Sequence, residues 1–383
     1  MSDAHGGTNV VRYGAAALAD ILPSALAALG VPGEPNVLEL EPAQSIVVLL
    51  VDGLGWNLLR RNAAIAPFLG SLAGRPLTAG FPTTTATSLA SLGTGLPPGQ
   101  HGITGYTSRV GDLPDPVNWL RWQTTHSGRN LIDELVPEQV QPRPTVLERA
   151  QRAGVDVSVV TSYAFRGTGL TRAVLRGGTF VPVLTSADTV ISAAAAALGR
   201  PSLVYCYTGD LDLIGHGRGT ASDAWCVQLA LLDRMIEMLA HRLPPGTRLL
   251  VVADHGMVDM PEDDKIDYDG EPLLSQDVVM LAGEARVRYV HVRPGSVEDV
   301  RARWQSVLGD RMAVLTRDEA IARGWYGPSV AEPVRERIGD LVVVSTSRAG
   351  IVRRRVEPRM SEMRGQHGAL TEDELLVPLL STP

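Results

Sequence analysis

Six side chains of metal-binding type stand beside glycines or directly after apolar segments. They are Asp52, Asp212, His216, Asp254, His255 and His367. Imidazole and carboxylate groups suit zinc and related divalent ions, and six of them with one shared oxygen ligand would fill two sites. Two neighbouring ions can stabilise both the attacking and the leaving oxygen of a phosphoryl transfer. The set therefore predicts a dimetal site for phosphoryl chemistry.

Most of these residues also have a structural explanation when taken alone. Asp52 with the following glycine is typical of a turn at a strand end. A buried imidazole at His255 could cap a helix, and His367 could be an ordinary loop histidine. The Asp212 and His216 pair, four residues apart among glycines, has no packing role that we can name. The conjunction of all six is what favours metal binding.

A run of hydroxyl residues offers a nucleophile. Thr83, Thr84, Thr85, Thr87 and Ser88 lead into a helix of small residues. A helix N-terminus attracts anions, although the same pattern also suits a simple Thr/Ser cap on a helix packed through alanine and glycine. A threonine alcohol is a poor nucleophile at neutral pH, but coordination to a divalent cation favours its alkoxide.

The elements that must position these groups can be predicted from apolar patterns. Continuous apolar runs at 45–51, 202–207 and 248–253 each end at carboxylates, and they lack the alternation of a strand with one wet face. Helical patterns at 58–73, 145–153, 221–241 and 297–308 lie between and after them. We therefore predict an α/β fold, a doubly wound and mainly parallel sheet, with the acidic turns along its carboxyl edge.

A second, smaller unit is predicted between residues 271 and 356. Strand patterns at 287–292 and 340–344 flank a helix there, which indicates a small α+β insert over the edge of the site. Residues 1–270 and 357–383 then form the catalytic core. Near the C-terminus, Thr371 and Glu374 have capping-box spacing and predict the start of a helix.

Composition limits the class of protein. The chain has 383 residues, 44% hydrophobic and 20% charged, which fits a globular enzyme. Its net charge of −7 argues against a nucleic-acid surface, and its apolar stretches fall short of the roughly 20 residues of a membrane helix. The two cysteines and an N-terminus without signal-peptide features predict a cytoplasmic protein. No feature indicates an oligomeric state.

The order of motifs resembles one known family. Asp52-Gly, Phe81-Pro-x-x-Thr85, Thr94-Gly-Leu-x-Pro-x-x-His101-Gly-Ile, Asp212-x-x-Gly-His216-x-x-Gly, Asp254-His-Gly-Met and Gly365-x-His367-Gly follow one another along the chain. Together they resemble the alkaline phosphatase superfamily, and within it the type I phosphodiesterase and nucleotide pyrophosphatase family, across about residues 44–383. The expected fold is therefore alkaline phosphatase-like.

The resemblance implies specific roles. One metal ion would be bound by Asp212, His216 and His367, and the other by Asp52, Asp254 and His255. Thr85 stands at the family's spacing for the nucleophile, which also bridges the ions. The ions would be Zn²⁺, with Mn²⁺ as the alternative that His/Asp ligands also accept.

The sequence departs from the family pattern at several positions. Leu211 replaces the proline before the Asp212 ligand, and Ala86-Thr87-Ser88 replaces Phe-Pro-Asn after the nucleophile. The asparagine that holds a phosphate oxygen in the family falls at Tyr106, so either the tyrosine hydroxyl replaces it or the substrate differs. Tyr163 and Phe165 match the family's substrate-facing loop loosely and are predicted substrate contacts.

The expected activity is hydrolysis of a phosphodiester or pyrophosphate bond in a small, nucleotide-like substrate. Two divalent cations, three aspartates and a Thr85 alkoxide sum to a nearly neutral site, which suits the single charge of a diester. A monoester would benefit from an arginine clamp, and Arg109, Arg121 and Arg166 are the loop candidates. The alternatives are a phosphomonoesterase or phosphonate hydrolase with the same ions, and a catalytically silent metal-binding relative. A sulfatase is disfavoured because no cysteine lies near the nucleophile segment.

Overall fold

A seven-stranded sheet forms the centre of the protein. The computed structural model describes residues 10–199 and 201–383. The strand order is β2-β18-β9-β1-β8-β6-β7, and β18 is antiparallel to both of its neighbours while the other pairs run parallel. The strands are β1 (Ser45–Val51), β2 (Ala73–Thr78), β6 (Asp156–Ser162), β7 (Thr179–Val183), β8 (Ser202–Thr208), β9 (Thr247–Val252) and β18 (Leu376–Ser381). The predicted doubly wound, mainly parallel α/β fold is confirmed.

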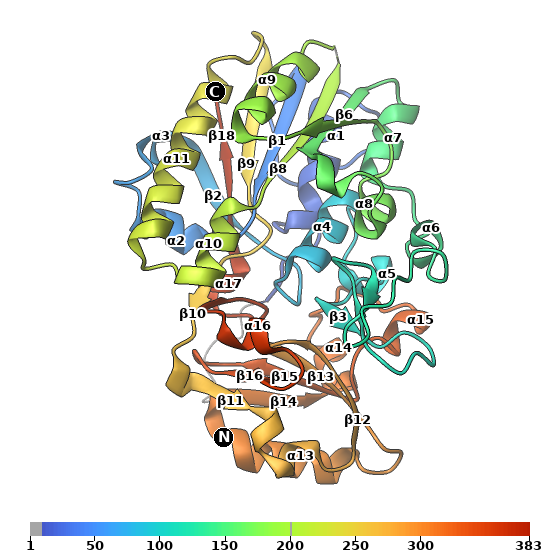
Figure 1. Cartoon of the computed structure of the whole chain (residues 1–383). Coiled ribbons are helices and arrows are strands. Elements are labelled where there is room, and N and C mark those ends of the chain that lie inside the picture. The colour runs from blue at the N-terminus through green and yellow to red at the C-terminus, as the bar shows by residue number, and fades with distance from the viewer. Residues whose placement is uncertain (1–9, 200) are drawn as a thin grey trace, which may run out of the picture.

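Helices cover both faces of this sheet, as Figure 1 shows. One face carries α2 (Trp56–Arg61), α3 (Pro67–Ser71), α9 (Ser186–Ala196), α10 (Asp210–Arg218) and α11 (Asp223–Ala240). The other carries α1 (Ile21–Ala28), α4 (Thr85–Thr94), α7 (Val146–Arg152) and α8 (Gly169–Val174). Burial on both faces explains why every residue of β1 is buried and why its sequence is a continuous apolar run.

Strand register brings the acidic turns together. Ser45 of β1 lies opposite Ser202 of β8 and Thr247 of β9, and Val51 lies opposite Thr208. The three central strands thus end at the same edge of the sheet, where parallel α/β folds bind their ligands. The three apolar runs predicted as strands are all present.

One predicted helix was wrong, and another starts where it was predicted but without the predicted cap. Residues 58–73 form two helices, because the side chain of Asn62 donates to the Leu58 carbonyl and ends α2, and Pro67 starts α3. A helix does start after Thr371, as predicted, but the capping box is absent. The Thr371 hydroxyl donates to the Glu374 carboxylate, which is engaged with other groups, and α17 (Glu372–Leu375) is a single turn before β18.

A four-stranded antiparallel sheet forms the lower part of the molecule in Figure 1. Its order is β12-β13-β15-β14, with β12 (Val278–Glu284), β13 (Val287–Val292), β14 (Met312–Thr316) and β15 (Leu341–Ser345). Helix α13 (Val297–Leu308) covers one face through Val300, Trp304 and Leu308. The predicted strands and helix of the small α+β unit are present, while its bounds at 271 and 356 stay a prediction.

Short elements join the two sheets. The pair of β10 (Val258–Asp259) with β17 (Gly365–Gln366) joins the two core segments that flank the insert. The pair of β11 (Lys265–Asp267) with β16 (Gly350–Val352) connects core and insert, and β3 (Thr107–Ser108), β4 (Val117–Asn118) and β5 (Gln123–Thr124) form another small sheet. The remaining helices are α5 (Pro98–His101), α6 (Pro137–Val140), α12 (Pro272–Ser275), α14 (Arg317–Ala322), α15 (Glu332–Arg335) and α16 (Pro358–Glu362). Among the described residues, no helix has the length and apolar character needed to cross a membrane.

Candidate metal centre and active site

Two buried aspartates leave the carboxyl ends of adjacent strands. Asp52 follows β1 and Asp254 follows β9. The backbone N–H groups of Gly53 and His255 both donate to Oδ1 of Asp254, at 3.1 Å each. This pair of bonds fixes the Asp254 carboxylate and leaves its Oδ2 turned toward His255 Nε2 at 3.4 Å.

Asp212 and His216 lie on helix α10, not in the glycine-flanked loop that the sequence suggested. Their spacing of four residues places them on one face of the helix, with Asp212 Oδ2 3.3 Å from His216 Nε2. Gly215 is needed inside this helix because a Cβ there would meet the sulfur of Met257 at 2.5 Å. Gly215 therefore allows close packing of the site helix and does not break it.

All three histidines of the cluster are oriented by backbone carbonyls. Nδ1 of His216 lies 2.7 Å from the Gly365 carbonyl oxygen, that of His255 3.0 Å from Gly256, and that of His367 2.8 Å from Thr83. A carbonyl only accepts, so each Nδ1 carries the proton. The second nitrogen of each ring, Nε2, is thereby directed at the carboxylates, as in histidines that bind metals.

The ligand atoms form two overlapping groups. Those of Asp212, His216 and His367 lie within 4.8 Å of one another, and so do those of Asp52, Asp212 and His255. The first group is the predicted ligand set of one metal. The second contains Asp212 where the prediction has Asp254, which nevertheless contacts His255 in the same cluster. The structure thus brings all six predicted ligands together.

The donor set fits divalent cations. One oxygen each of Asp52, Asp212 and Asp254 is buried with no hydrogen-bond partner among the described residues, which is costly for a carboxylate. Burial and the charge of Asp52 raise the pKa of both Asp212 and Asp254 well above the ordinary range. Burial lowers the pKa of His255, yet the carboxylates of Asp254 and Asp52 outweigh it and raise that pKa to about 10. Such a cluster is short of positive charge, and metal ions would supply it.

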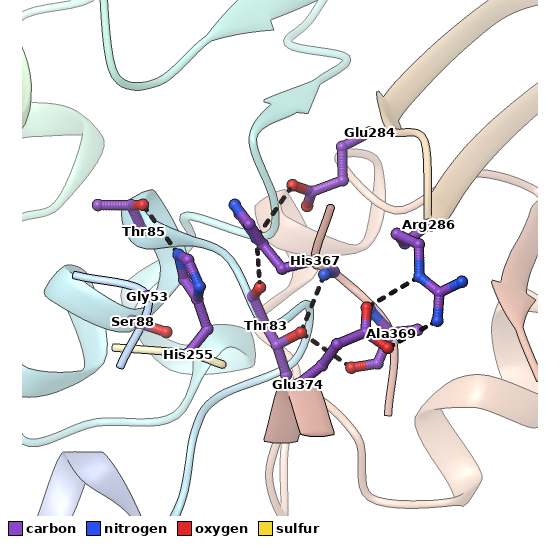
Figure 2. Close-up of polar contacts among 12 residues, drawn as sticks. Gly53, Thr83, Thr85, Ser88, His255, Glu284, Arg286, His367, Ala369 and Glu374 are labelled. Atoms are coloured by element: carbon purple, nitrogen blue, oxygen red, sulfur yellow. Dashed lines mark hydrogen bonds and ion pairs between the residues drawn. The ribbon is translucent and has the colours of Figure 1, made fainter. Parts of the chain in front are cut away.

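Thr85 presents its hydroxyl to this cluster. It is the first residue of α4, and Oγ1 lies 3.2 Å from His255 Nε2 and 3.5 Å from Asp52 Oδ2. Of its neighbours, Thr83 donates its hydroxyl to Ala369, and the buried Thr87 hydroxyl has no partner among the described residues. Figure 2 shows Thr85 and His255 facing each other, with Thr83 turned toward the loop of His367. The geometry agrees with the choice of Thr85, whose role as nucleophile stays a prediction.

A cavity of about 210 Å³ opens beside Thr85, Asp52 and Asp212. Its wall is mainly apolar or hydroxyl-bearing: Leu89, Leu120, Thr161, Phe165, Thr168, Leu170, Thr171, Leu175, Tyr205 and Tyr207. Phe165 packs edge-on against Tyr207, with ring centroids 5.7 Å apart. None of the described residues that line this cavity is lysine or arginine.

The predicted substrate residues separate in space. Phe165 lines the cavity, whereas Tyr163 is 64% exposed and does not line it. Tyr106 is half-buried outside the cavity lining, and burial raises its pKa. The loop arginines Arg109 and Arg166 are engaged elsewhere, with the Gly111 carbonyl and the Phe180 ring respectively.

Two residues near the site were missed from the sequence, Tyr207 and Glu284, and a third, Thr83, was named only as part of the hydroxyl run. Tyr207 donates its hydroxyl hydrogen to Asp52 Oδ2, and Glu284 reaches within 3.8 Å of His367 Nδ1 from the end of β12. Thr83 contacts the His367 loop through both backbone and side chain. Tyr207, the last tyrosine before an acidic turn, could have been found as a polar residue at a strand's carboxyl end. Glu284 gave no such signal, and nothing in the hydroxyl run indicated the contact of Thr83 with the His367 loop.

Comparison with known proteins decides the family. Residues 46–370 match the family described as type I phosphodiesterase / nucleotide pyrophosphatase. The chain belongs to this family. The resemblance inferred from the motif order is confirmed, and with it the membership of a family of metal-dependent phosphodiesterase and pyrophosphatase-type hydrolases.

Two solved structures illustrate the similarity of fold. Murine ectonucleotide pyrophosphatase / phosphodiesterase 5, as an inactive threonine-to-alanine variant in complex with AMP, superimposes with a TM-score of 0.67 at 17% identity, covering 88% of this chain and 87% of that one. Phosphonoacetate hydrolase from Sinorhizobium meliloti 1021, in complex with phosphonoacetate, has a TM-score of 0.62 at 21% identity, with coverage of 89% and 90%.

A curated relative matches over a shorter stretch. Phosphopentomutase from Rhizobium meliloti (strain 1021) is 30% identical over 118 residues, which is 30% of this chain. The matched stretch spans only 27% of that relative's length. This likeness thus leaves most of both chains unmatched.

Proposed function

We propose that this member of the family hydrolyses phosphodiester or pyrophosphate bonds, with Thr85 as nucleophile and two divalent metal ions, most suitably Zn²⁺, held by Asp52, Asp212, His216, Asp254, His255 and His367. Mn²⁺ is the alternative that the same ligands accept. Bound at these side chains, the ions would supply Lewis-acid stabilisation of the charge that develops on the phosphoryl oxygens. Nucleophilic attack, proton transfer and binding of the phosphoryl oxygens would be carried out by residues of the chain.

Thr85 would attack phosphorus in line with the leaving group. The Thr85 Oγ–P bond forms as the bond from phosphorus to the leaving oxygen breaks. The hydroxyl proton passes to Asp52 Oδ2, which lies 3.5 Å away, and the leaving oxygen takes a proton from water. Water then cleaves the phosphothreonine ester from the opposite side and regenerates the Thr85 hydroxyl. Both steps invert at phosphorus.

The N-terminus of α4 would hold the phosphoryl oxygens. Thr84 occupies the N-cap position but makes no side-chain bond to the first turn, so the N–H groups of that turn have no side-chain cap. Unsatisfied N–H groups and the helix dipole attract anions. The nucleophile and the anion-binding groups are then adjacent residues of one helix.

The lining of the cavity beside Thr85 is the observation that favours a diester substrate over a monoester or a phosphonate. The described residues of its lining include no cation, so they offer no partner for the carboxylate of a phosphonate such as phosphonoacetate or for the second charge of a monoester. Its leucines and Phe165 suit an uncharged, flat or apolar substituent such as a nucleoside base or an aryl group. The likeness to phosphonoacetate hydrolase concerns the fold.

Two statements about the murine relative agree with this proposal. Its inactive form has alanine in place of a threonine, and it was solved in complex with AMP. A threonine nucleophile and a small nucleotide-like substrate in the present chain would be consistent with both. We also propose a cytoplasmic location, because Cys206 and Cys226 are free thiols.

Comparing three substrates tests the proposal. Zinc-loaded protein should cleave bis-p-nitrophenyl phosphate faster than p-nitrophenyl phosphate, and should leave phosphonoacetate intact. Faster turnover of the monoester would contradict the proposal and identify the protein as a phosphomonoesterase. Release of phosphate from phosphonoacetate would make the protein a phosphonate hydrolase, and no turnover of any substrate would favour a metal-binding relative.

A further inference from the structure

Thr83 makes four hydrogen bonds to a single loop far away in the sequence. Its N–H donates to the Gly368 carbonyl at 3.0 Å, and its hydroxyl donates to the Ala369 carbonyl at 2.8 Å. The same hydroxyl accepts the Gly368 N–H at 3.0 Å, and its carbonyl accepts the Nδ1 proton of His367 at 2.8 Å. Thr83 is fully buried, so no water replaces these bonds.

These bonds join two parts of the site. Thr83 lies two residues before Thr85, and His367 lies in the loop after β17. The bond to the Thr83 carbonyl fixes the tautomer of His367, so its Nε2 remains a lone-pair nitrogen on the side of Asp212, 4.0 Å from Oδ1. The hydroxyl bonds fix the backbone next to that ring. Thr83 thus sets the position of His367 relative to Thr85.

The insert holds the same loop from the other side. The Ala369 N–H donates to Glu374 Oε1 at 3.0 Å, and the guanidinium of Arg286 donates to both oxygens of Glu374 at 3.0 and 2.7 Å. Arg286 and Glu374 are fully buried. Figure 2 shows the loop carrying His367 between Thr83 on one side and the pair of Arg286 with Glu374 on the other.

We propose that Thr83 is a positioning residue, whose hydroxyl holds the His367 loop so that His367 Nε2 faces the metal cluster. The inference rests on the proposed function only in treating His367 as a metal ligand. Groups that orient a ligand histidine typically change metal affinity about 10- to 100-fold when they are removed. Thr83 itself touches neither metal nor substrate.

Substitution by an isosteric residue separates this role from simple packing. Thr83→Val keeps the shape and removes the hydroxyl, and Thr83→Ser keeps the hydroxyl. Thr87→Val is the matched control, because the Thr87 hydroxyl is equally buried but has no partner among the described residues. The measurement is Zn²⁺ affinity by competition with a chromogenic chelator, together with the ¹⁵N shifts of the His367 ring, assigned with His367→Gln.

The proposal predicts that Thr83→Val weakens one of two Zn²⁺ binding steps by about tenfold or more. Its apo protein should give His367 ring shifts of mixed tautomers, while Thr83→Ser and Thr87→Val retain wild-type affinity and shifts. Wild-type affinity and a single Nδ1–H tautomer in Thr83→Val would overturn it. If Thr83→Val fails to fold, Thr83→Ala removes the same hydroxyl without adding a methyl group. Its Zn²⁺ affinity and His367 ring shifts then support or overturn the proposal in the same way.

Failure of the proposed function would be seen separately. The metal titration and the ring shifts need no substrate, so they report on Thr83 even if wild-type protein cleaves no phosphodiester. Conversely, if the wild type cleaves phosphodiesters and Thr83→Val has wild-type Zn²⁺ affinity and ring shifts, the positioning role of Thr83 is contradicted while the proposed function stands. A variant with weak Zn²⁺ binding but intact fold by circular dichroism supports positioning over a general packing defect.

Discussion

The hydroxyl of Tyr207 donates a hydrogen bond to Oδ2 of Asp52, the same carboxylate oxygen that lies 3.5 Å from the Thr85 hydroxyl. Burial acts to raise the pKa of Asp52, but hydrogen bonds from His255 and Tyr207 and the charge of His255 bring it below its ordinary value. His255, with a smaller contribution from Tyr207 at the end of the neighbouring strand, therefore keeps the Asp52 carboxylate ionised.

Tyr207→Phe should weaken the site without unfolding it. The change removes one hydrogen bond to Asp52, so the carboxylate binds metal less tightly, and we expect a loss of about 10- to 100-fold in metal affinity or in kcat. Steady-state kinetics at increasing Zn²⁺ concentration measures both. Tyr268→Phe, which removes the same atom from the 3-10 turn Tyr268–Gly270 of the insert, should retain wild-type values. Equal losses in the two variants would contradict the assignment.

Thr85→Ala should abolish turnover and leave metal content intact. A nucleophile that forms a covalent intermediate has no substitute when its oxygen is removed, so we expect kcat to fall by at least about a thousandfold. Elemental analysis of the purified variant checks that the metals remain. Thr85→Ser should retain part of the activity, because it keeps the hydroxyl. An alanine variant with full activity would mean that another residue is the nucleophile.

Phe165→Ala should raise KM for aryl diesters. Phe165 lines the cavity beside Thr85, and removing its ring exposes apolar substrate surface worth about 1–2 kcal/mol, or about 5- to 30-fold in KM. Tyr163→Ala is the control, since Tyr163 is mostly exposed and does not line the cavity. Kinetics with bis-p-nitrophenyl phosphate distinguish the two. A larger effect at Tyr163 would place the substrate outside this cavity.

The strand ends could be predicted from sequence because their signal is local. The apolar runs before Asp52 and Asp254 are buried on both faces, and parallel pairing brings their ends together without further information. The family motifs located His367 and Thr85, which no local pattern would have joined. The helix at Asp212 was hidden by its glycines, which disfavour helices in general, although one of them, Gly215, packs closely against Met257 here.

Contacts across the two sheets could not be predicted. Glu284 is one carboxylate at the end of an ordinary strand, and only the fold places it beside His367. Arg286 reads as a surface residue, yet it is fully buried against Glu374. Such long-range pairs depend on how the insert packs on the core, and no periodic pattern of residues in the sequence indicates that packing. The same reason explains why Glu374 was misread as part of a capping box.

Stability should fall with acid because of His101. Burial, with the nearby Arg337 charge, lowers the pKa of His101 to about 3, so it stays neutral in the folded state. Its Nδ1 accepts the N–H of Ile103, a bond that a proton on Nδ1 would break. The unfolded chain binds that proton below its ordinary pKa of about 6.5. The contribution is thus complete above pH 6.5 and is lost as the pH falls from there toward 3, by at most about 1.4 kcal/mol per pH unit.

His101→Asn provides the test, since the amide keeps an acceptor near the Ile103 N–H but does not titrate. Urea unfolding at pH 8 and pH 5 should show a smaller acid loss in the variant than in the wild type. Burial lowers the pKa of His291 to about 4, which acts in the same direction. The stability of a variant changed at both positions should therefore depend even less on pH. An unchanged slope in both variants would remove the histidines as the cause.

Glu374→Gln should destabilise the protein far more than its size suggests. The glutamine keeps the shape, but the buried guanidinium of Arg286 is left without an opposite charge, a change that costs about 3–5 kcal/mol in comparable pairs. Glu134→Gln is the matched control, because the pair of Arg129 with Glu134 is about half-exposed and such pairs contribute about 0–1 kcal/mol. Urea unfolding of both variants measures the difference. Because the Ala369 N–H also loses its carboxylate partner, Glu374→Gln should bind Zn²⁺ less tightly as well. Similar free energies of unfolding in the two variants would show that the buried pair does not hold the insert to the His367 loop.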